Sequence, residues 1–234
     1  MRALLVRVGA DCTEAGGRWN GPVDPGSGAF AYVPIPEQEP VRPGLETPYV
    51  RWAPAVRRLG IELPAALRDR PAHHDPDFGH LTYGDRRERG RQIREKLAAG
   101  DLLVFYAGLR DVHGGGLVYG LIGLLTVEEI VRARDVPPER WPENAHTRRA
   151  EIGETDVVVH GERSASGRFG RCLPFAGFRS GAYRVHAELL DRWGGLGVRD
   201  GYVQRSARLP ELHDPARFLG WLDAQGVALV ARDN

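Results

Sequence analysis

The stretch GDLLVFYAGLRDVHGGGLVYGLIGLLTV, residues 100–127, decides the fold. It holds two apolar runs, 102–109 and 116–127, and the glycine-rich HGGG at 113–116 joins them as a hairpin loop would. Gly120 and Gly123 weaken the second run locally but permit the sharp bend that a small curled barrel needs. The stretch therefore predicts a buried β-hairpin at the centre of a curled sheet.

A helix is expected immediately before this hairpin, over residues 84–99. Asp85 can cap it, Glu88 follows three positions later, and Ile93 and Leu97 give a narrow apolar stripe. We expect this helix to pack beside the hairpin. Further strands are predicted at 3–8, 29–35, 155–160 and 227–232, a polar loop at 161–171, and helices within 48–70 and at 127–134, 183–195 and 214–226.

The fold class that follows is α+β. The chain has 234 residues, which fits one large domain or two small ones. We find no internal repeat, low-complexity tract or separating linker, so we expect a single domain over 1–234, with a curled mixed or antiparallel sheet flanked by helices.

Composition limits the classes of function. Basic side chains number 32 and acidic ones 31, so the net charge of +1 argues against coating nucleic acid by bulk charge and leaves a local basic groove open. Two cysteines exclude a disulfide framework and an all-thiolate metal site. The apolar run at the N-terminus is too short for a signal peptide or membrane span, so we expect a soluble, cytoplasmic protein.

The segment AHHDPDFGHLTYGD, residues 72–85, is the densest group of chemically active side chains. His74, Asp75 and Asp77 lie between further histidines, and such a group can bind a divalent ion or place a base beside an acid. The alternative is an Asx-Pro turn whose carboxylates accept backbone N–H bonds. The spacing matches no standard zinc pattern, so the presence of a metal stays open.

A second polar group follows the first predicted strand. Arg7 ends that strand, Asp11 lies just beyond, and Gly16 and Gly17 let the backbone approach a ligand closely. Such groups suit a planar or phosphate-bearing ligand, and the alternative is an ordinary ion pair at a strand end.

Two resemblances extend these interpretations. The order of helix, GDLLVFYAG, hairpin and GLVYGLIGLLTV is similar to PUA-like domains, including the EVE and YTH types that hold flipped bases. The ordered blocks RVGADC, HHDPDF, GDLLVFYAGLR, LVYGLIGLLTVEEI and NAHT resemble the nucleotide modification associated domain family, third type. That resemblance implies an association with systems that make or handle modified DNA bases. The matching polar positions are Arg7, Asp11, His74, Asp75, Asp77, Arg110 and His146.

Three hypotheses of function remain. In the first, the protein is an enzyme of nucleobase or nucleotide chemistry, with Asp75 and Asp77 as acid–base or metal-holding carboxylates. Its other catalytic or binding groups are His74 and His146 for proton transfer or ligation, and Arg7 and Arg110 as clamps on phosphate or carbonyl groups. In the second it is a non-catalytic reader of a modified base, with Tyr106, Trp19 or Trp52 stacking on that base. In the third it is a structural partner in a modification complex.

The number of acid–base residues exceeds what a reader needs and favours the enzyme. The expected partners are DNA or a nucleotide and other components of a base-modification system, with no membrane. The cofactor is unknown, and a divalent metal is one option. We further expect Asp75 and Asp77 to lie in a concave pocket with Arg7 or Arg110 within roughly 4 Å.

Overall fold

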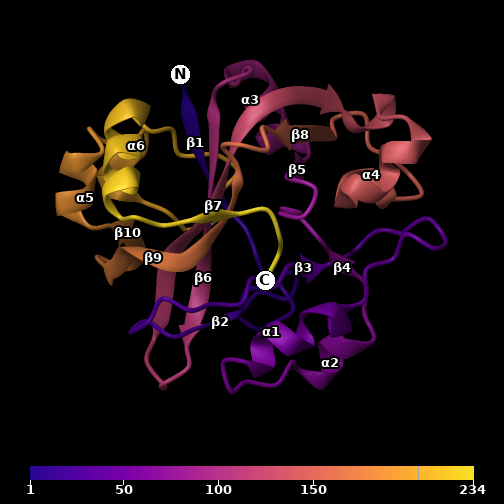
Figure 1. The fold of residues 1–234 in the computed structure, drawn as a ribbon, viewed down its shortest axis with the longest axis horizontal. Helices are drawn as coiled ribbons and strands as arrows, with labels where there is room; N and C mark the ends of the chain where they lie inside the picture. Colours follow the sequence, from indigo (N-terminus) through magenta and orange to yellow (C-terminus); the bar gives the residue numbers. More distant parts are fainter. Residues whose placement is uncertain (205) are drawn as a thin grey trace.

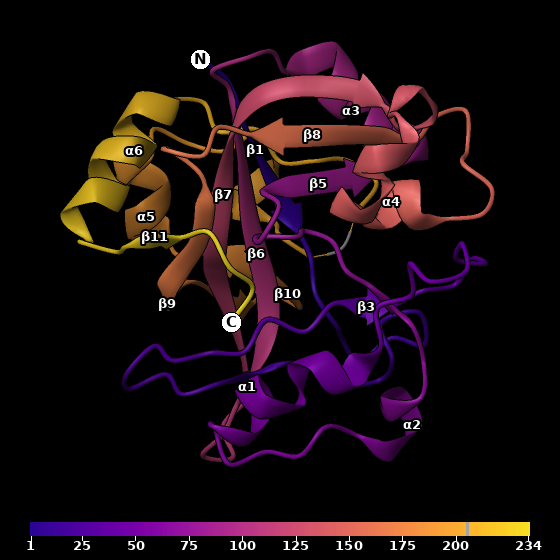
Figure 2. The ribbon, with the colours of Figure 1, turned by 45° about the vertical axis from the view of Figure 1, so that its right-hand side comes forward.

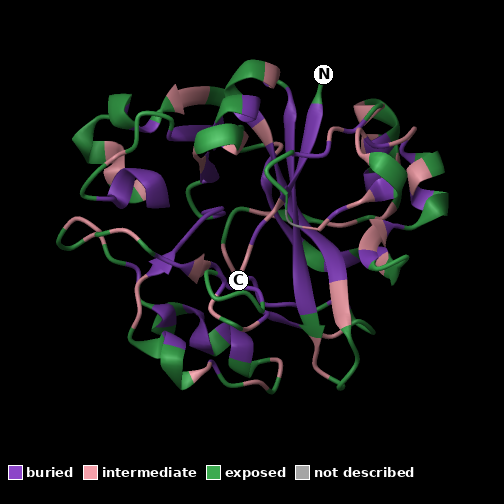
Figure 3. Ribbon diagram, turned by 180° about the vertical axis from the view of Figure 1, so that it is seen from behind, coloured by how far each residue is buried: buried purple, intermediate pink, exposed green. Residues whose placement is uncertain are grey.

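The predicted hairpin forms the centre of the molecule. The computed structural model describes residues 1–204 and 206–234. Strand β6 (Leu102–Asp111) pairs antiparallel with β7 (Leu117–Arg132), which confirms the prediction, and the two form the long ladder seen in Figure 1. Most of β6 and the first half of β7 are buried. Within this hairpin, Figure 3 shows exposed residues around the tip and buried residues along the middle of both strands.

The remaining strands extend the hairpin into one mixed sheet. Its main path runs β1-β6-β7-β8-β5, with β1 parallel to β6 and the other neighbours antiparallel. Strands β9 and β2 pair with β7 and β6, and β10 and β11 both pair with β9. The bounds are β1 (Ala3–Arg7), β2 (Pro22–Val23), β5 (Thr82–Asp85), β8 (Val157–Gly161), β9 (Gly167–Arg179), β10 (Ala182–Val185) and β11 (Leu229–Val230), and β3 (Ile35–Pro36) with β4 (Ala72–His73) forms a separate pair.

This architecture is a mixed α+β domain, as the sequence indicates. The end strands β1 and β5 do not pair with each other in the part of the chain that the structure describes, so the sheet stays open. A PUA-like partial barrel is therefore not confirmed.

Strand β7 bends and takes part in both halves of the sheet. Residues 117–126 pair with β6, whereas residues 127–132 pair with β8 across a register shift between Val127 and Glu129. Figure 2 shows this second half turning over β8 and β5. A Cβ on Gly123 would lie 2.6 Å from the Phe78 ring, so glycine is needed there for that ring to pack. The bend turns β8 and β5, and the segment that precedes β5, away from the hairpin.

Helices cover the sheet on both sides. Helix α3 (Arg87–Lys96) places Ile93, with Leu97 beyond its end, in one core with Leu103 and Phe105, which confirms that this helix packs beside the hairpin. Helices α5 (Ala187–Arg192) and α6 (Pro215–Ala224) pack on a second core (Figure 1). The other helical segments are η1 (Tyr49–Trp52), α1 (Ala53–Arg57), α2 (Ala65–Arg68), η2 (Ala133–Asp135), η3 (Pro138–Glu143), α4 (Ala145–Arg148) and η4 (Arg199–Gly201). None of the described helices is long and apolar enough to cross a membrane.

Several local predictions were wrong. The expected helix at 127–134 is the end of β7, because pairing with β8 outweighs the local capping signal. The expected loop at 161–171 contains the start of β9, and the expected helix at 183–195 begins as β10. Residues 29–34 form no regular strand, although Phe30 makes an isolated bridge to Val23.

Candidate active site

A cavity of about 230 Å³ lies where the end of β1, strand β5 and helix α4 come together. Its walls come from five separate parts of the chain, within residues 7–15, 35–38, 73–75, 83–89 and 146–149. Four of the predicted site residues line it: Arg7, Asp11, Asp75 and His146. The other four, His74, Asp77, Tyr106 and Arg110, are not among the residues that line this cavity.

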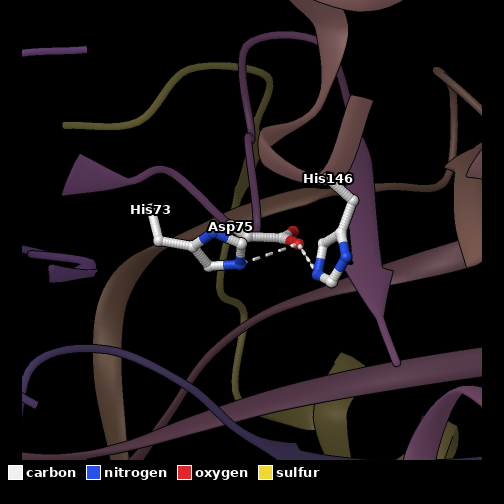
Figure 4. Close-up of side chains that lie close together, drawn as sticks. All are labelled: His73, Asp75 and His146. Atoms are coloured by element: carbon white, nitrogen blue, oxygen red, sulfur yellow. Dashed lines mark ion pairs between the residues drawn. The ribbon is translucent and has the colours of Figure 1, made fainter. Parts of the chain in front are cut away.

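Three side chains converge at one point of the cavity wall. The Nε2 atoms of His73 and His146 lie 3.9 Å and 3.7 Å from the same carboxylate oxygen, Oδ2 of Asp75. Figure 4 shows the two imidazole rings approaching this carboxylate from opposite sides. All three residues are buried, and their rings and carboxylate lie beyond hydrogen-bond distance of one another. We call this group the His–Asp–His centre.

Each imidazole of the centre is held from behind by a carboxylate. His73 Nδ1 lies 2.6 Å from Glu37 Oε2, and His146 Nδ1 lies 2.9 Å from Asp156 Oδ2. Arg149 joins these two carboxylates, since its guanidinium lies 3.1 Å from Glu37 and 3.6 Å from Asp156. A carboxylate that accepts the Nδ1–H fixes the tautomer with a free Nε2, so both rings present an acceptor nitrogen toward Asp75.

Asp75 itself is oriented by two neutral donors. Its Oδ2 accepts the backbone N–H of Gly84 at 2.7 Å, and its Oδ1 accepts from the Asn144 amide at 3.4 Å. Burial raises the pKa of this carboxyl well above its usual range, and the nearby carboxylates of Asp85 and Asp77 add to that rise. No arginine or lysine lies within ion-pair distance of Asp75 in residues 1–204 and 206–234.

Glu37 and the His73 ring that it supports differ in charge state. Burial works against ionisation of Glu37, but its hydrogen bond with His73 and the charge of Arg149 outweigh burial and hold the Glu37 pKa below its usual range. Burial lowers the pKa of His73 to about 4, although Glu37 acts in the other direction. At neutral pH the centre therefore has a neutral His73 beside an ionised Glu37.

Gly84 lets strand β5 approach the centre closely. A Cβ at this position would lie 2.4 Å from His146 Cδ2 and 2.7 Å from Asn144 Oδ1, both of which are buried. Gly84→Ala is therefore expected to push the His146 ring away from Asp75 and to destabilise the fold by about 1–3 kcal/mol through overpacking. Chemical denaturation measures the stability, and the NMR signals of the His146 ring report its displacement. Gly116→Ala is the control, because nothing lies within 4 Å of a Cβ there.

The other face of the 73–78 segment is anchored in the body of the protein. His74 is fully buried, and its Nδ1 and Nε2 lie 3.2 Å from Asp77 and 2.9 Å from Asp233, too poorly aligned for hydrogen bonds but within ion-pair distance. Asp77 also accepts from Arg148 at 2.9 Å and from the backbone N–H groups of Gly79 and His80. This arrangement matches the turn alternative and ties the segment in place.

The predicted arginine contacts of Asp75 and Asp77 are therefore wrong. Arg148, and not Arg7 or Arg110, pairs with Asp77. Arg7 instead lies 3.7 Å from Asp11 and over the ring of Tyr119 at 5.2 Å, at the cavity wall. Arg110 is exposed near the tip of the hairpin, where its backbone N–H donates to Gly21.

The aromatic residues considered for stacking lie outside the cavity wall. Tyr106 is buried, and its hydroxyl donates to the carbonyl of Val203 at 2.7 Å. Trp52 is buried with its ring at 5.1 Å from that of His74, and Trp19 packs against the small core around α1 and α2. Tyr83 is the aromatic residue that does line the cavity.

Sequence reasoning missed His73, Glu37, Asp156 and Arg149. His73 had a usable signal, because alternate side chains of an extended segment face opposite sides, so His73 and Asp75 share a face that His74 does not. Glu37 and Asp156 had none, since they reach the centre from distant segments and carry no motif of their own.

The fold and the cavity together define a mixed α+β domain with a buried polar centre open to a ligand-sized pocket. A family model, nucleotide modification associated domain 3, matches residues 2–192, and the chain belongs to this family. The cavity and the His–Asp–His centre lie within the matched residues. No curated protein and no solved structure matches the chain.

Proposed function

We propose that this protein is an enzyme that acts on a nucleobase or nucleotide, and that the cavity is its active site. One observation carries the proposal: His73 and Asp75, from one segment, meet His146, from another, at a cavity wall with their reactive atoms facing one another. The family supports a role in nucleotide modification. Perturbed titratable groups that converge in a pocket are typical of catalytic sites.

A purely structural network fits these contacts less well. Structural polar clusters close their hydrogen bonds, as Asp77 does with Arg148 and two backbone N–H groups. In the His–Asp–His centre the outer nitrogens are satisfied, while the Nε2 atoms stand 3.7–3.9 Å from Asp75 beside open volume. That pattern leaves reactive positions available to a ligand.

The rest of the cavity wall suits a polar ring better than a bare anion. Its arginines are matched by carboxylates, since Arg7 pairs with Asp11, Arg89 with Asp85 and Arg149 with Glu37. Such a wall offers both donors and acceptors, as the edge of a nucleobase does. The volume of about 230 Å³ lies just below the range for drug-sized ligands, roughly 300–1,000 Å³, and suits one small ligand.

Arg86 is the best-placed group for a phosphate. It lines the cavity and also the adjoining hollow that contains Arg87, and its side chain is about one-third exposed. Its partner Glu39 is equally exposed, and such surface pairs are weak, about 0–1 kcal/mol, so a phosphate can displace the carboxylate. We propose that the base enters the cavity and the phosphate contacts Arg86.

Arg86→Ala is expected to weaken binding of a deoxynucleoside monophosphate about tenfold, as loss of a charge-assisted hydrogen bond of about 1.5 kcal/mol requires. Calorimetric titration at two salt concentrations measures this. Arg91→Ala is the matched control, because Arg91 is exposed on helix α3, which begins directly after Arg86, and pairs with Glu88 and Glu95 away from the cavity. Equal affinity in the two variants, or no nucleotide binding by the unmodified protein, would contradict the proposal.

The non-catalytic reader is supported less well, because Tyr83 is the single aromatic side chain in the described cavity wall. We propose DNA or free nucleotides as the substrate, the cytoplasm as the place of action, and other components of a base-modification system as partners. Mass spectrometry of a single-stranded oligonucleotide and of the four deoxynucleotides, after incubation with the protein, tests whether a base or nucleotide is converted.

A further inference from the structure

We propose that His73, Asp75 and His146 bind one divalent transition-metal ion, through Nε2 of each imidazole and a carboxylate oxygen of Asp75. The three ligand atoms all lie within 4.8 Å of one another. The metal would serve the enzyme proposed above, but binding of an ion is measured without any substrate.

The distances suit ligands around a common ion. Two ligand atoms that each lie about 2.1 Å from one ion stand about 3–3.5 Å apart, depending on the bond angle. The Nε2 atoms of His73 and His146 stand 3.9 Å and 3.7 Å from Asp75 Oδ2, so movements of a few tenths of an ångström close the site. A direct hydrogen bond would have brought the same atoms to about 2.9 Å.

The surroundings of the centre are those of a metal ligand set. Metal-binding histidines usually donate their second ring N–H to a carboxylate, and ligating carboxylates are themselves hydrogen-bonded. Here Glu37 and Asp156 lie behind the two rings at 2.6 Å and 2.9 Å, and Gly84 donates to Asp75. Neither Nε2 atom has a hydrogen-bond partner among the residues that the structure describes.

Charge also favours a cation at this point. Asp75 is buried, and its ion-pair contacts in the described part of the chain are to imidazoles alone. Glu37, which lies nearby, forms an ion pair with Arg149. No arginine or lysine among the described residues forms such a pair with Asp75. A divalent ion would place a positive charge beside this carboxyl, where the described residues place no arginine or lysine.

The ligand types select the class of metal. Imidazole suits zinc, iron, copper and nickel, whereas magnesium and calcium prefer oxygen ligands, so two imidazoles with one carboxylate favour a first-row transition metal. Three protein ligands leave coordination positions open, as in catalytic zinc sites and in two-histidine, one-carboxylate iron sites. Because all three residues line the cavity, the open positions would face a substrate or a water molecule.

A second group of possible ligands, His74, Asp77 and Asp233, serves a different purpose. Both nitrogens of His74 already lie at carboxylates, and Asp77 is occupied by Arg148 and His80. None of the three lines the cavity around the His–Asp–His centre. This group is therefore the alternative metal site, and the experiment must distinguish it from the His–Asp–His centre.

The test uses the whole protein, stripped of metal with a chelator and titrated with Co²⁺, Zn²⁺ and Mg²⁺. We expect one equivalent of Co²⁺ to bind with d–d absorption bands that report nitrogen ligands, Zn²⁺ to displace it, and Mg²⁺ not to compete. His73→Gln and His146→Gln are expected to lose this spectrum and at least 100-fold in Co²⁺ affinity. Glu37→Gln and Asp156→Asn should lose about 10–100-fold, because they act through the ligands.

Two controls keep the outcome clear. His113→Gln removes an exposed histidine near the hairpin tip and should bind Co²⁺ as the unmodified protein does. Circular dichroism and thermal melting show whether each variant is folded, and Asp156→Asn supplies a conservative change if His146→Gln is unfolded. The proposal is overturned if Co²⁺ does not bind, if Mg²⁺ competes equally, or if folded His73→Gln protein retains the spectrum. Co²⁺ binding without any nucleotide binding would leave the metal site standing and refute the proposed function.

Discussion

Asp75→Asn protein is expected to fold normally and to lose about 10²–10⁴-fold of its activity on nucleotides, the usual range for removal of a catalytic acid–base group. Asparagine keeps the shape of the side chain, and its Oδ1 can still accept the N–H of Gly84. An amide cannot ionise, so the side chain at position 75 can neither transfer a proton nor bind a metal ion as a carboxylate. Stability should not fall, because burial already disfavours the charged carboxylate.

Conversion of a single-stranded oligonucleotide and of the four deoxynucleotides, followed by mass spectrometry, measures this loss. The matched control is Asp101→Asn, since Asp101 is also buried and accepts two backbone N–H groups but lies outside the cavity wall. The control should keep the full activity of the unmodified protein. If Asp75→Asn protein is as active as this control, Asp75 takes no part in the chemistry.

The aspartate two positions further on should behave in the opposite way. Asp77→Ala is expected to lower the free energy of unfolding by about 3–5 kcal/mol, because it leaves the buried Arg148 guanidinium without its carboxylate. It also removes one of the two carboxylates beside His74, and the oxygen that accepts the N–H groups of Gly79 and His80. For a chain of this size the melting temperature should fall by about 10 °C.

Urea denaturation measures this loss against a surface control. Glu62→Ala breaks two exposed pairs, with Arg57 and Arg68, and should cost less than about 1 kcal/mol. A double variant in which Asp77 and Arg148 are both replaced by apolar residues should recover part of the stability, since no unpaired charge then remains. Similar losses for Asp77→Ala and Glu62→Ala would show that Asp77 does not anchor the segment.

The parts of the fold that could be predicted are those that local pattern determines. The hairpin at 102–127 and helix α3 follow from apolar runs and a glycine loop within one stretch of chain. The predicted cap was wrong, because Asp85 ends strand β5 and the residue that precedes α3, Arg86, makes no side-chain cap hydrogen bond. Strand β9 was missed because its burial pattern is irregular, with exposed residues at 170–171 and 174 interrupting the buried ones. The end of β7 was mistaken for a helix because its strand partner, β8, lies beyond the local window.

The candidate site was partly predictable for the same reason. Asp75 and His146 could be singled out because acid–base residues in a short motif attract notice. Their supports could not, because the contact of Arg149 with Glu37 spans 112 positions and joins the residue that follows α4 to the residue that follows β3. From the sequence, Asp75 and Asp77 were equally good candidates, and the three-dimensional structure distinguishes them, because only Asp75 lines the cavity.

One face of the segment 73–78 lines the cavity, and the other face packs against the body of the protein. Mutations on the two faces should therefore leave different traces in large variant screens. A screen for abundance or heat resistance would detect changes at His74 and Asp77 and overlook those at His73 and Asp75. Variants that are inactive but normally stable would not be detected by such a screen. Variant effects in this segment therefore need an activity measurement beside the stability measurement.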